Sequence, residues 1–188
     1  MIKIEIVFSD NFFRFLKMYA SLTGTSINST IVFFITNQVS NLKAMQKEGR
    51  EEEIKEYIDK LKSIKYRKLS VKESEHRKRK TLSISEKLEN ELYKLAKTLG
   101  YSRNELIRRM LDIEKQRLFP EVSDEIKEIT KNTRKTKISI PISTALKGTL
   151  QDISNRTEMP VNNIITHILV EYLLQNYNTL KNIELPDD

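Results

Sequence analysis

The sequence predicts a mainly α-helical fold with short β-strands, organised as three tandem strand–helix–helix units. The first observation behind this prediction is an internal repeat. Three segments of about forty residues align without a gap, the second 76 positions after the first and the third a further 58 positions on. The second observation is a change of hydrophobic period within each segment, from the alternation of a strand to the spacing of a helix.

Each unit begins with a short stretch in which every second residue is apolar, as is typical of a strand with one buried face. The apolar positions of the three predicted strands are Ile4, Ile6 and Phe8; Leu82 and Ile84; and Ile138, Ile140 and Ile142. A serine follows each stretch, at Ser9, Ser85 and Ser143. Because a serine hydroxyl can accept a hydrogen bond from an amide of the first helical turn, these serines predict helix starts.

Two helices follow each serine. The first is indicated by apolar residues at helical spacing, which are Phe12, Leu16 and Tyr19; Leu88, Leu92 and Leu95; and Leu146, Leu150 and Ile153. A break then falls at equivalent positions, beginning at Gly24, Gly100 and Glu158. Glycine suits a left-handed helix end, so the breaks separate the first helix from a second apolar one around 31–39, 106–111 and 164–174.

The repeat divides the chain into three units, two linkers and a tail. The predicted boundaries are 1–44 for the first unit, 45–75 for an amphipathic helical linker, 76–118 for the second unit with a basic arm, 119–134 for a short linker, 135–178 for the third unit and 179–188 for the tail. In the helical linker, Ile54, Ile58 and Leu61 lie along one helical face. This apolar stripe covers too few heptads for a coiled coil, so we expect it to pack on a neighbouring unit.

The second unit carries the residues of a known superfamily. The stretch Arg79-Lys80-Thr81-Leu82-Ser83-Ile84-Ser85 is followed by Leu88, Leu92, Leu95-Ala96, Gly100-Tyr101-Ser102 and Leu106-Ile107. This pattern resembles the ribbon-helix-helix superfamily of DNA-binding proteins, of the Arc/MetJ/CopG type, and the other two units resemble it by pattern rather than identity. The resemblance covers about 120 of the 188 residues. It implies that two units pair their strands into an antiparallel ribbon, interlock their helices and insert the ribbon into the major groove of double-stranded DNA.

The resemblance also implies which residues read base edges, namely the outward-facing strand positions. These are Arg79, Thr81 and Ser83 in the second unit, Lys137 and Ser139 in the third, and Lys3 and Glu5 in the first. Arginine can donate twice to guanine, and threonine or serine can donate, accept or touch a thymine methyl. Because Glu5 repels phosphate, we expect the first unit to be degenerate and to serve in dimerisation.

A second set of residues is expected to contact phosphates. It consists of Arg77, Lys78, Lys80, Ser102, Arg103, Asn104, Ser26, Asn28, Asn162 and Asn163. The first three belong to the basic arm that leads into the second strand, for which a solvated charge run is the alternative. The others match, through the resemblance, positions at the N-terminus of the second helix, where free amides bind anions. Helix capping is the alternative for the two serines.

Charge and composition narrow the class of protein. The chain has 33 Lys and Arg against 26 Asp and Glu, a net charge of +7, which favours an anionic partner. It has no cysteine and only two histidines, with no catalytic or metal-ligand spacing, so we expect no enzyme, no metal and no cofactor. The longest wholly apolar run, 31–35, is far shorter than the roughly 20 residues of a membrane helix. We therefore expect a soluble cytoplasmic protein with no membrane partner.

Three units that pair in twos leave one unit over, so we expect self-association as a homodimer through the unpaired unit. Basic residues precede the second and third strands, which favours pairing of these two units within the chain and dimerisation of the first across chains. The apolar second helices of the first and third units favour the alternative pairing of those two, with the second unit left to homodimerise.

The predicted function is sequence-specific binding of double-stranded DNA, as a transcriptional regulator that acts as a repressor. One alternative is an accessory role in plasmid or viral DNA maintenance or transfer. The other is an antitoxin-like interaction scaffold, in which the first unit and a protein partner site at 45–75 hold another protein.

Overall fold

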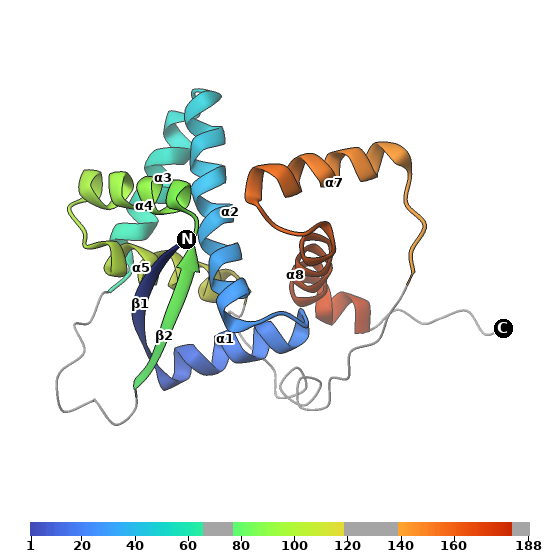
Figure 1. Cartoon of the computed structure of the whole chain (residues 1–188), viewed down its shortest axis with the longest axis horizontal. Coiled ribbons are helices and arrows are strands. Elements are labelled where there is room, and N and C mark those ends of the chain that lie inside the picture. The colour runs from blue at the N-terminus through green and yellow to red at the C-terminus, as the bar shows by residue number, and fades with distance from the viewer. Residues whose placement is uncertain (66–76, 119–138, 182–188) are drawn as a thin grey trace.

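The computed structural model describes residues 1–65, 77–118 and 139–181, which are mainly helical with a two-stranded antiparallel sheet (Figure 1). The elements in chain order are β1 (Ile2–Ser9), α1 (Asp10–Leu22), α2 (Ile27–Lys47), α3 (Glu51–Ser63), β2 (Arg77–Ile84), α4 (Glu86–Leu99), α5 (Arg103–Leu118), α7 (Thr144–Thr157) and α8 (Val161–Lys181). The prediction of a mainly α-helical fold with short strands is confirmed.

The two strands of the sheet come from the first and second units. β1 and β2 pair along their whole length, with Glu5 opposite Thr81 at the centre. We call this pair of strands, Ile2–Ser9 and Arg77–Ile84, the ribbon. The favoured pairing of the second and third units is therefore wrong, and so is the alternative of the first and third. The physical reason is burial, because the apolar residues of β1, among them Ile4 and Ile6, share one core with Leu82 of β2. Apolar burial therefore outweighs the shared basic character of the two lead-ins as a guide to strand pairing.

The first and second units are related by an approximate two-fold axis that passes through the ribbon. Glu5 and Thr81 are equivalent positions of the repeat, and they face each other across the strands. The equivalent pair Gln38 and Glu114 also meets, since Nε2 of Gln38 donates to Oε1 of Glu114 at 2.8 Å between α2 and α5. Residues 76 positions apart thus contact each other in two places, across the strands of the ribbon and between α2 and α5.

The core lies behind the ribbon, among α1, α2, α4 and α5. Its fully buried side chains include Ile4, Ile6, Leu16, Tyr19, Ile31, Phe34, Ile35, Leu82, Ile84, Leu92 and Leu106. Leu61 of the linker helix α3 and Ile64, directly after the helix, join this core, and Arg109 of α5 donates to the backbone carbonyls of both. Of the predicted apolar stripe of the linker, Leu61 thus packs on the first two units as expected, and Ile54 and Ile58 are only partly buried.

The helix boundaries of the three units follow the repeat. The hydroxyls of Ser9, Ser85 and Ser143 each accept the amide of the residue three positions on, as predicted for N-caps. At the breaks the backbone is left-handed in all three units, with φ of 62° at Gly24, 72° at Gly100 and 58° at Glu158. The third unit therefore places a residue with a Cβ where the other two place glycine.

We expect Glu158→Gly to raise the free energy of unfolding of the third unit by about 1 kcal/mol, because a left-handed backbone strains residues that carry a Cβ. Urea denaturation of the variant beside the unsubstituted chain measures this gain. Glu158→Ala is the matched control, since it removes the same carboxylate but keeps the Cβ. Equal stability of the glycine and alanine variants would contradict the explanation.

The third unit contributes α7 and α8, which pack against α2 and α5 (Figure 1). In the described part of its predicted strand, residues 139–143, no strand is formed, and Ile140 and Ile142 are 59% and 40% exposed. Lys137 and Ile138 lie outside the described residues, as do the linker 119–134 and residues 182–188 of the tail. A strand requires a hydrogen-bonded neighbour, and residues 139–143 pair with neither β1 nor β2.

Candidate nucleic-acid interface

The outward face of the ribbon is formed by three cross-strand pairs. These are Lys3 with Ser83, Glu5 with Thr81, and Val7 with Arg79. Because successive side chains of a strand point to opposite faces, these residues face away from the core that the intervening residues enter. The structure thus brings together all five base-contact positions predicted in the first two units: Lys3, Glu5, Arg79, Thr81 and Ser83.

An ion pair lies across this outward face. Nε of Arg79 is 3.2 Å from Oε1 of Glu5, and the two side chains are 77% and 55% exposed. An ion pair this exposed contributes about 0–1 kcal/mol, because water screens the charges. Arg79 can therefore exchange Glu5 for another acceptor at small cost.

Two asparagines attach the second helices to the centre of the ribbon. Nδ2 of Asn28, in the first turn of α2, donates to the carbonyl of Thr81 at 3.0 Å. Nδ2 of Asn104, in the first turn of α5, donates to the carbonyl of Glu5 at 3.1 Å. These two contacts are equivalent under the repeat. Asn28 and Asn104, both predicted to contact phosphate, thus already form hydrogen bonds within the protein. These bonds hold the first turns of α2 and α5 beside the ribbon.

The helix starts themselves remain accessible. The hydroxyl of Ser26 accepts the amide of Ser29 at 3.0 Å, and the hydroxyl of Ser102 accepts the amide of Glu105 at 3.2 Å. Both serines are exposed. The first-turn amides of a helix have no partner within the helix and carry its positive dipole end. Capping, the alternative for these serines, is therefore observed, and the capping residue at the positive end of each helix is exposed.

The basic residues around the ribbon differ in where they point. Arg77 and Lys78 begin β2, and Lys78 is exposed. The ammonium of Lys80 lies 5.7 Å from the centroid of the Phe13 ring of α1, on the inward-facing parity of the strand. Arg103 is ion-paired with Glu89 of α4. Of Lys78, Lys80 and Arg103, whose side chains the structure describes, Lys78 is thus the cation most open to solvent.

The predicted contacts of the third unit that the structure describes are Ser139, Asn162 and Asn163. Ser139 and Asn162 are exposed and Asn163 is partly buried. Since residues 139–143 pair with neither strand of the ribbon, the structure does not join these side chains to the five outward-facing positions of the first two units.

The chain matches no family model, no curated protein and no solved structure. Within the described residues, no group of three or more His, Asp or Glu side chains is arranged to hold a metal ion. No helix of those same residues is both long and apolar enough to cross a membrane. The geometry and charge of the ribbon are thus the observations that bear on function.

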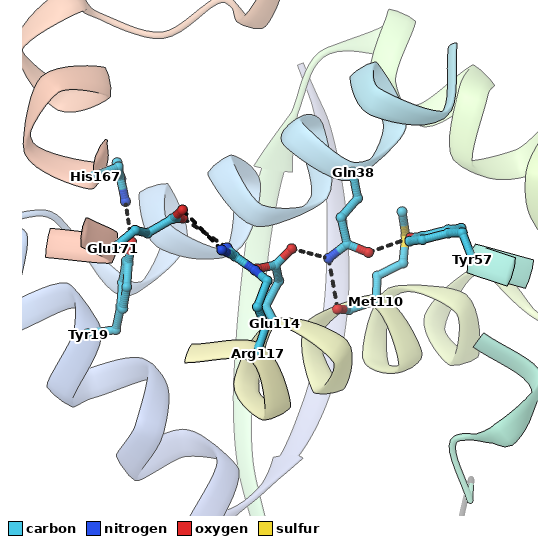
Figure 2. A network of polar contacts seen from close by, with 8 residues as sticks. All are labelled: Tyr19, Gln38, Tyr57, Met110, Glu114, Arg117, His167 and Glu171. Carbon is cyan, nitrogen blue, oxygen red and sulfur yellow. Dashed lines mark hydrogen bonds and ion pairs between the residues drawn. The ribbon is translucent and has the colours of Figure 1, made fainter. Parts of the chain in front are cut away.

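A partly buried polar network, which the sequence did not reveal, joins the third unit to the first two (Figure 2). The guanidinium of Arg117 on α5 donates to Glu114 at 2.6 Å and to Glu171 of α8 at 3.2 Å. Glu114 also accepts from Gln38, which in turn accepts from the hydroxyl of Tyr57 on α3. Polar residues at helix positions that otherwise carry apolar side chains are the signal that such a network leaves in a sequence.

Next to this network, His167 of α8 is fully buried. Nδ1 of His167 lies 3.2 Å from the hydroxyl of Tyr19 on α1, and its ring stacks on Phe33 of α2 with 3.7 Å between centroids. Burial lowers the pKa of His167 to about 4. Burial also raises the pKa of Glu114 above its usual value, an effect that Arg117 opposes.

Proposed function

We propose that this protein binds double-stranded DNA sequence-specifically and acts as a transcriptional repressor, by placing the β1–β2 ribbon in the major groove. The observation that carries the proposal is the outward face of the ribbon, which presents Lys3, Arg79, Thr81 and Ser83 in a strip two strands wide. The major groove of B-DNA is about 12 Å wide and admits a two-stranded ribbon.

The outward side chains have the chemistry to read base edges. Arg79 can donate two hydrogen bonds to a guanine, and Thr81 and Ser83 can donate, accept or contact a thymine methyl. Glu5 can accept from the amino group of a cytosine. Because Arg79 and Glu5 lie 3.2 Å apart, they suit neighbouring or paired bases in which an acceptor and a donor sit side by side.

The helix starts supply a phosphate clamp on each side of this strip. Asn28 and Asn104 tie the first turns of α2 and α5 to opposite strands of the ribbon, close to the two-fold axis. The positive ends of both helices, at Ser26 and Ser102, are then placed to bind one phosphate each. Such contacts fix the register of a protein on DNA, while the strand residues supply the specificity.

The resemblance of the second unit to the ribbon-helix-helix superfamily supports the same proposal, because a ribbon formed by two strand–helix–helix units is what that resemblance implies. We also propose that the third unit is a further ribbon-helix-helix unit. The proposal includes no catalytic step and no cofactor.

The direct test is selection from a random pool of duplex DNA at near-physiological salt, followed by salt titration of the recovered sequences. We expect a recurrent motif and an affinity that falls with salt, as phosphate contacts require. Retention of DNA without any enriched motif would overturn sequence-specific reading, and the absence of retained DNA would overturn the proposal as a whole.

On the recovered motif, we expect Arg79→Ala to weaken binding by about 1–3 kcal/mol, because one bidentate base contact is lost. Fluorescence anisotropy with labelled duplexes measures the change. Arg50→Ala is the matched control, since Arg50 is an ion-paired surface arginine at the start of α3 and its removal changes the net charge equally. A similar loss in both variants would show that Arg79 acts through charge alone and does not read a base.

A further inference from the structure

The third unit packs on the rest of the chain with one face and leaves another apolar face exposed. Ile164, His167 and Val170 of α8 are buried, and Glu171 bonds Arg117 of α5. The exposed apolar face, with the fraction of each residue that is exposed, consists of Ile140 59%, Ile142 40%, Leu146 47%, Ile168 50%, Leu169 47%, Tyr172 57% and Leu173 52%. We call this set the free face of the third unit.

The strand positions of the free face have buried equivalents in the other two units. Ile140 and Ile142 are the equivalents of Leu82 and Ile84, which are 0% and 1% exposed, and in the first unit of Ile6 and Phe8, at 0% and 3%. These residues are buried where the first and second units pair. The exposed strand residues of the third unit are therefore those that the repeat uses for pairing.

The same equivalence holds on the second helix of each unit. Ile168 and Leu169 of α8 are the equivalents of Met110 and Leu111 of α5, both 0% exposed. Their counterparts on α2, Phe34 and Ile35, are also 0% exposed. Burying four such side chains per chain would contribute several kcal/mol, at about 25 cal/mol per Å² of apolar surface.

Asn162 and Tyr172 indicate that the free face is covered by a second copy of the third unit. Asn162 is the equivalent of Asn28 and Asn104, which donate to the strand of the opposite unit, and Asn162 is exposed. Tyr172 is the equivalent of Gln38 and Glu114, which contact each other on the two-fold axis. The third unit thus retains the asparagine that ties one unit to its partner, and it presents a tyrosine where two copies would meet.

We propose that the third unit pairs with the third unit of a second chain, so that the protein is a dimer with a second two-stranded ribbon built from both chains. In this ribbon Ser139 faces Ser139 of the second copy, because Ser139 is equivalent to Glu5 and Thr81, which face each other in the first ribbon. Asn162 donates to the backbone carbonyl of Ser139 in the other chain. This inference does not depend on DNA binding.

The chain has no cysteine, so single introduced cysteines can test the register. Directly opposed residues of antiparallel strands lie about 4.5–5.5 Å apart between Cα atoms, which a disulfide can span. We therefore expect Ser139→Cys to form a covalent dimer on mild oxidation. Pro141→Cys is the matched control on the same strand, because in this register it lies about 13 Å from its own copy along the strands. Equal cross-linking of the two variants would overturn the register.

Sedimentation equilibrium of the full chain tests the dimer itself. We expect a dimer at micromolar concentration, and we expect the pair Ile168→Glu and Leu169→Glu to raise its dissociation constant by at least about 100-fold, because each dimer would bury four unpaired carboxylates. Tyr93→Glu, which alters another exposed apolar residue on α4, is expected to leave it unchanged. A monomer at tens of micromolar, or a dimer insensitive to the glutamates, would overturn the proposal.

Discussion

Replacing Arg117 with alanine is expected to lower the free energy of unfolding by about 3–5 kcal/mol. The guanidinium of Arg117 lies between two carboxylates, Glu114, which is 4% exposed, and Glu171 of the third unit. Without this cation, Glu114 is buried with its charge uncompensated, or it must take up a proton. Urea denaturation followed by circular dichroism measures the cost.

An exposed ion pair provides the control for Arg117. Lys43 and Glu91 lie 2.9 Å apart, but the lysine side chain is 45% exposed, so Lys43→Ala should cost about 1 kcal/mol or less. Adding Glu114→Gln to Arg117→Ala should recover part of the loss, because the buried carboxylate is then neutral. If Arg117→Ala were no more costly than Lys43→Ala, burial of the network would not govern its energy.

Acidification is expected to destabilise the folded chain by about 3 kcal/mol through His167. Burial lowers the pKa of His167 from 6.5 to about 4 in the folded state, and each unit of pKa corresponds to about 1.36 kcal/mol. Between these values the unfolded chain binds more protons than the folded chain. The contribution of neutral His167 is therefore complete above about pH 6.5 and is lost as the pH falls toward 4.

The variant His167→Phe isolates this effect, since phenylalanine can stack on Phe33 as the imidazole does but cannot titrate. Urea denaturation at pH 7 and pH 4 should show a loss of stability on acidification that is about 3 kcal/mol smaller in the variant than in the unsubstituted chain. Glu114 cannot produce the same difference, because its raised pKa favours proton uptake by the folded state. Equal losses in both proteins would exclude His167 as the acid-sensitive group.

The features that depend on neighbouring residues could be predicted from the sequence. The three capping serines, the breaks at Gly24 and Gly100, and the apolar spacing of the helices each depend on contacts within a few residues. The outward strand positions of the candidate site, such as Arg79 and Thr81, also follow from simple alternation. These parts of the fold and of the candidate site needed no knowledge of long-range contacts.

The features that depend on distant residues could not be predicted. The choice of partner for β2 depends on how completely each candidate strand buries its apolar side chains, and no local pattern measures that burial. The same holds for Asn28 and Asn104, whose amides find backbone acceptors only once the two units interlock. Gln38 and Glu114 reveal their role only when α2 and α5 lie side by side.

Because both strands of the β1–β2 ribbon belong to one chain, dilution does not take the ribbon apart, as it would a ribbon formed between separate chains. The shared chain also allows the two rows of outward side chains to differ, with Lys3 opposite Ser83 and Val7 opposite Arg79. A ribbon made from two identical chains has two-fold symmetry, whereas the two ends of this ribbon carry different outward side chains. If the ribbon binds DNA as we propose, a DNA segment lying along it would therefore have a preferred direction, and the favoured sequence would not need to be a palindrome.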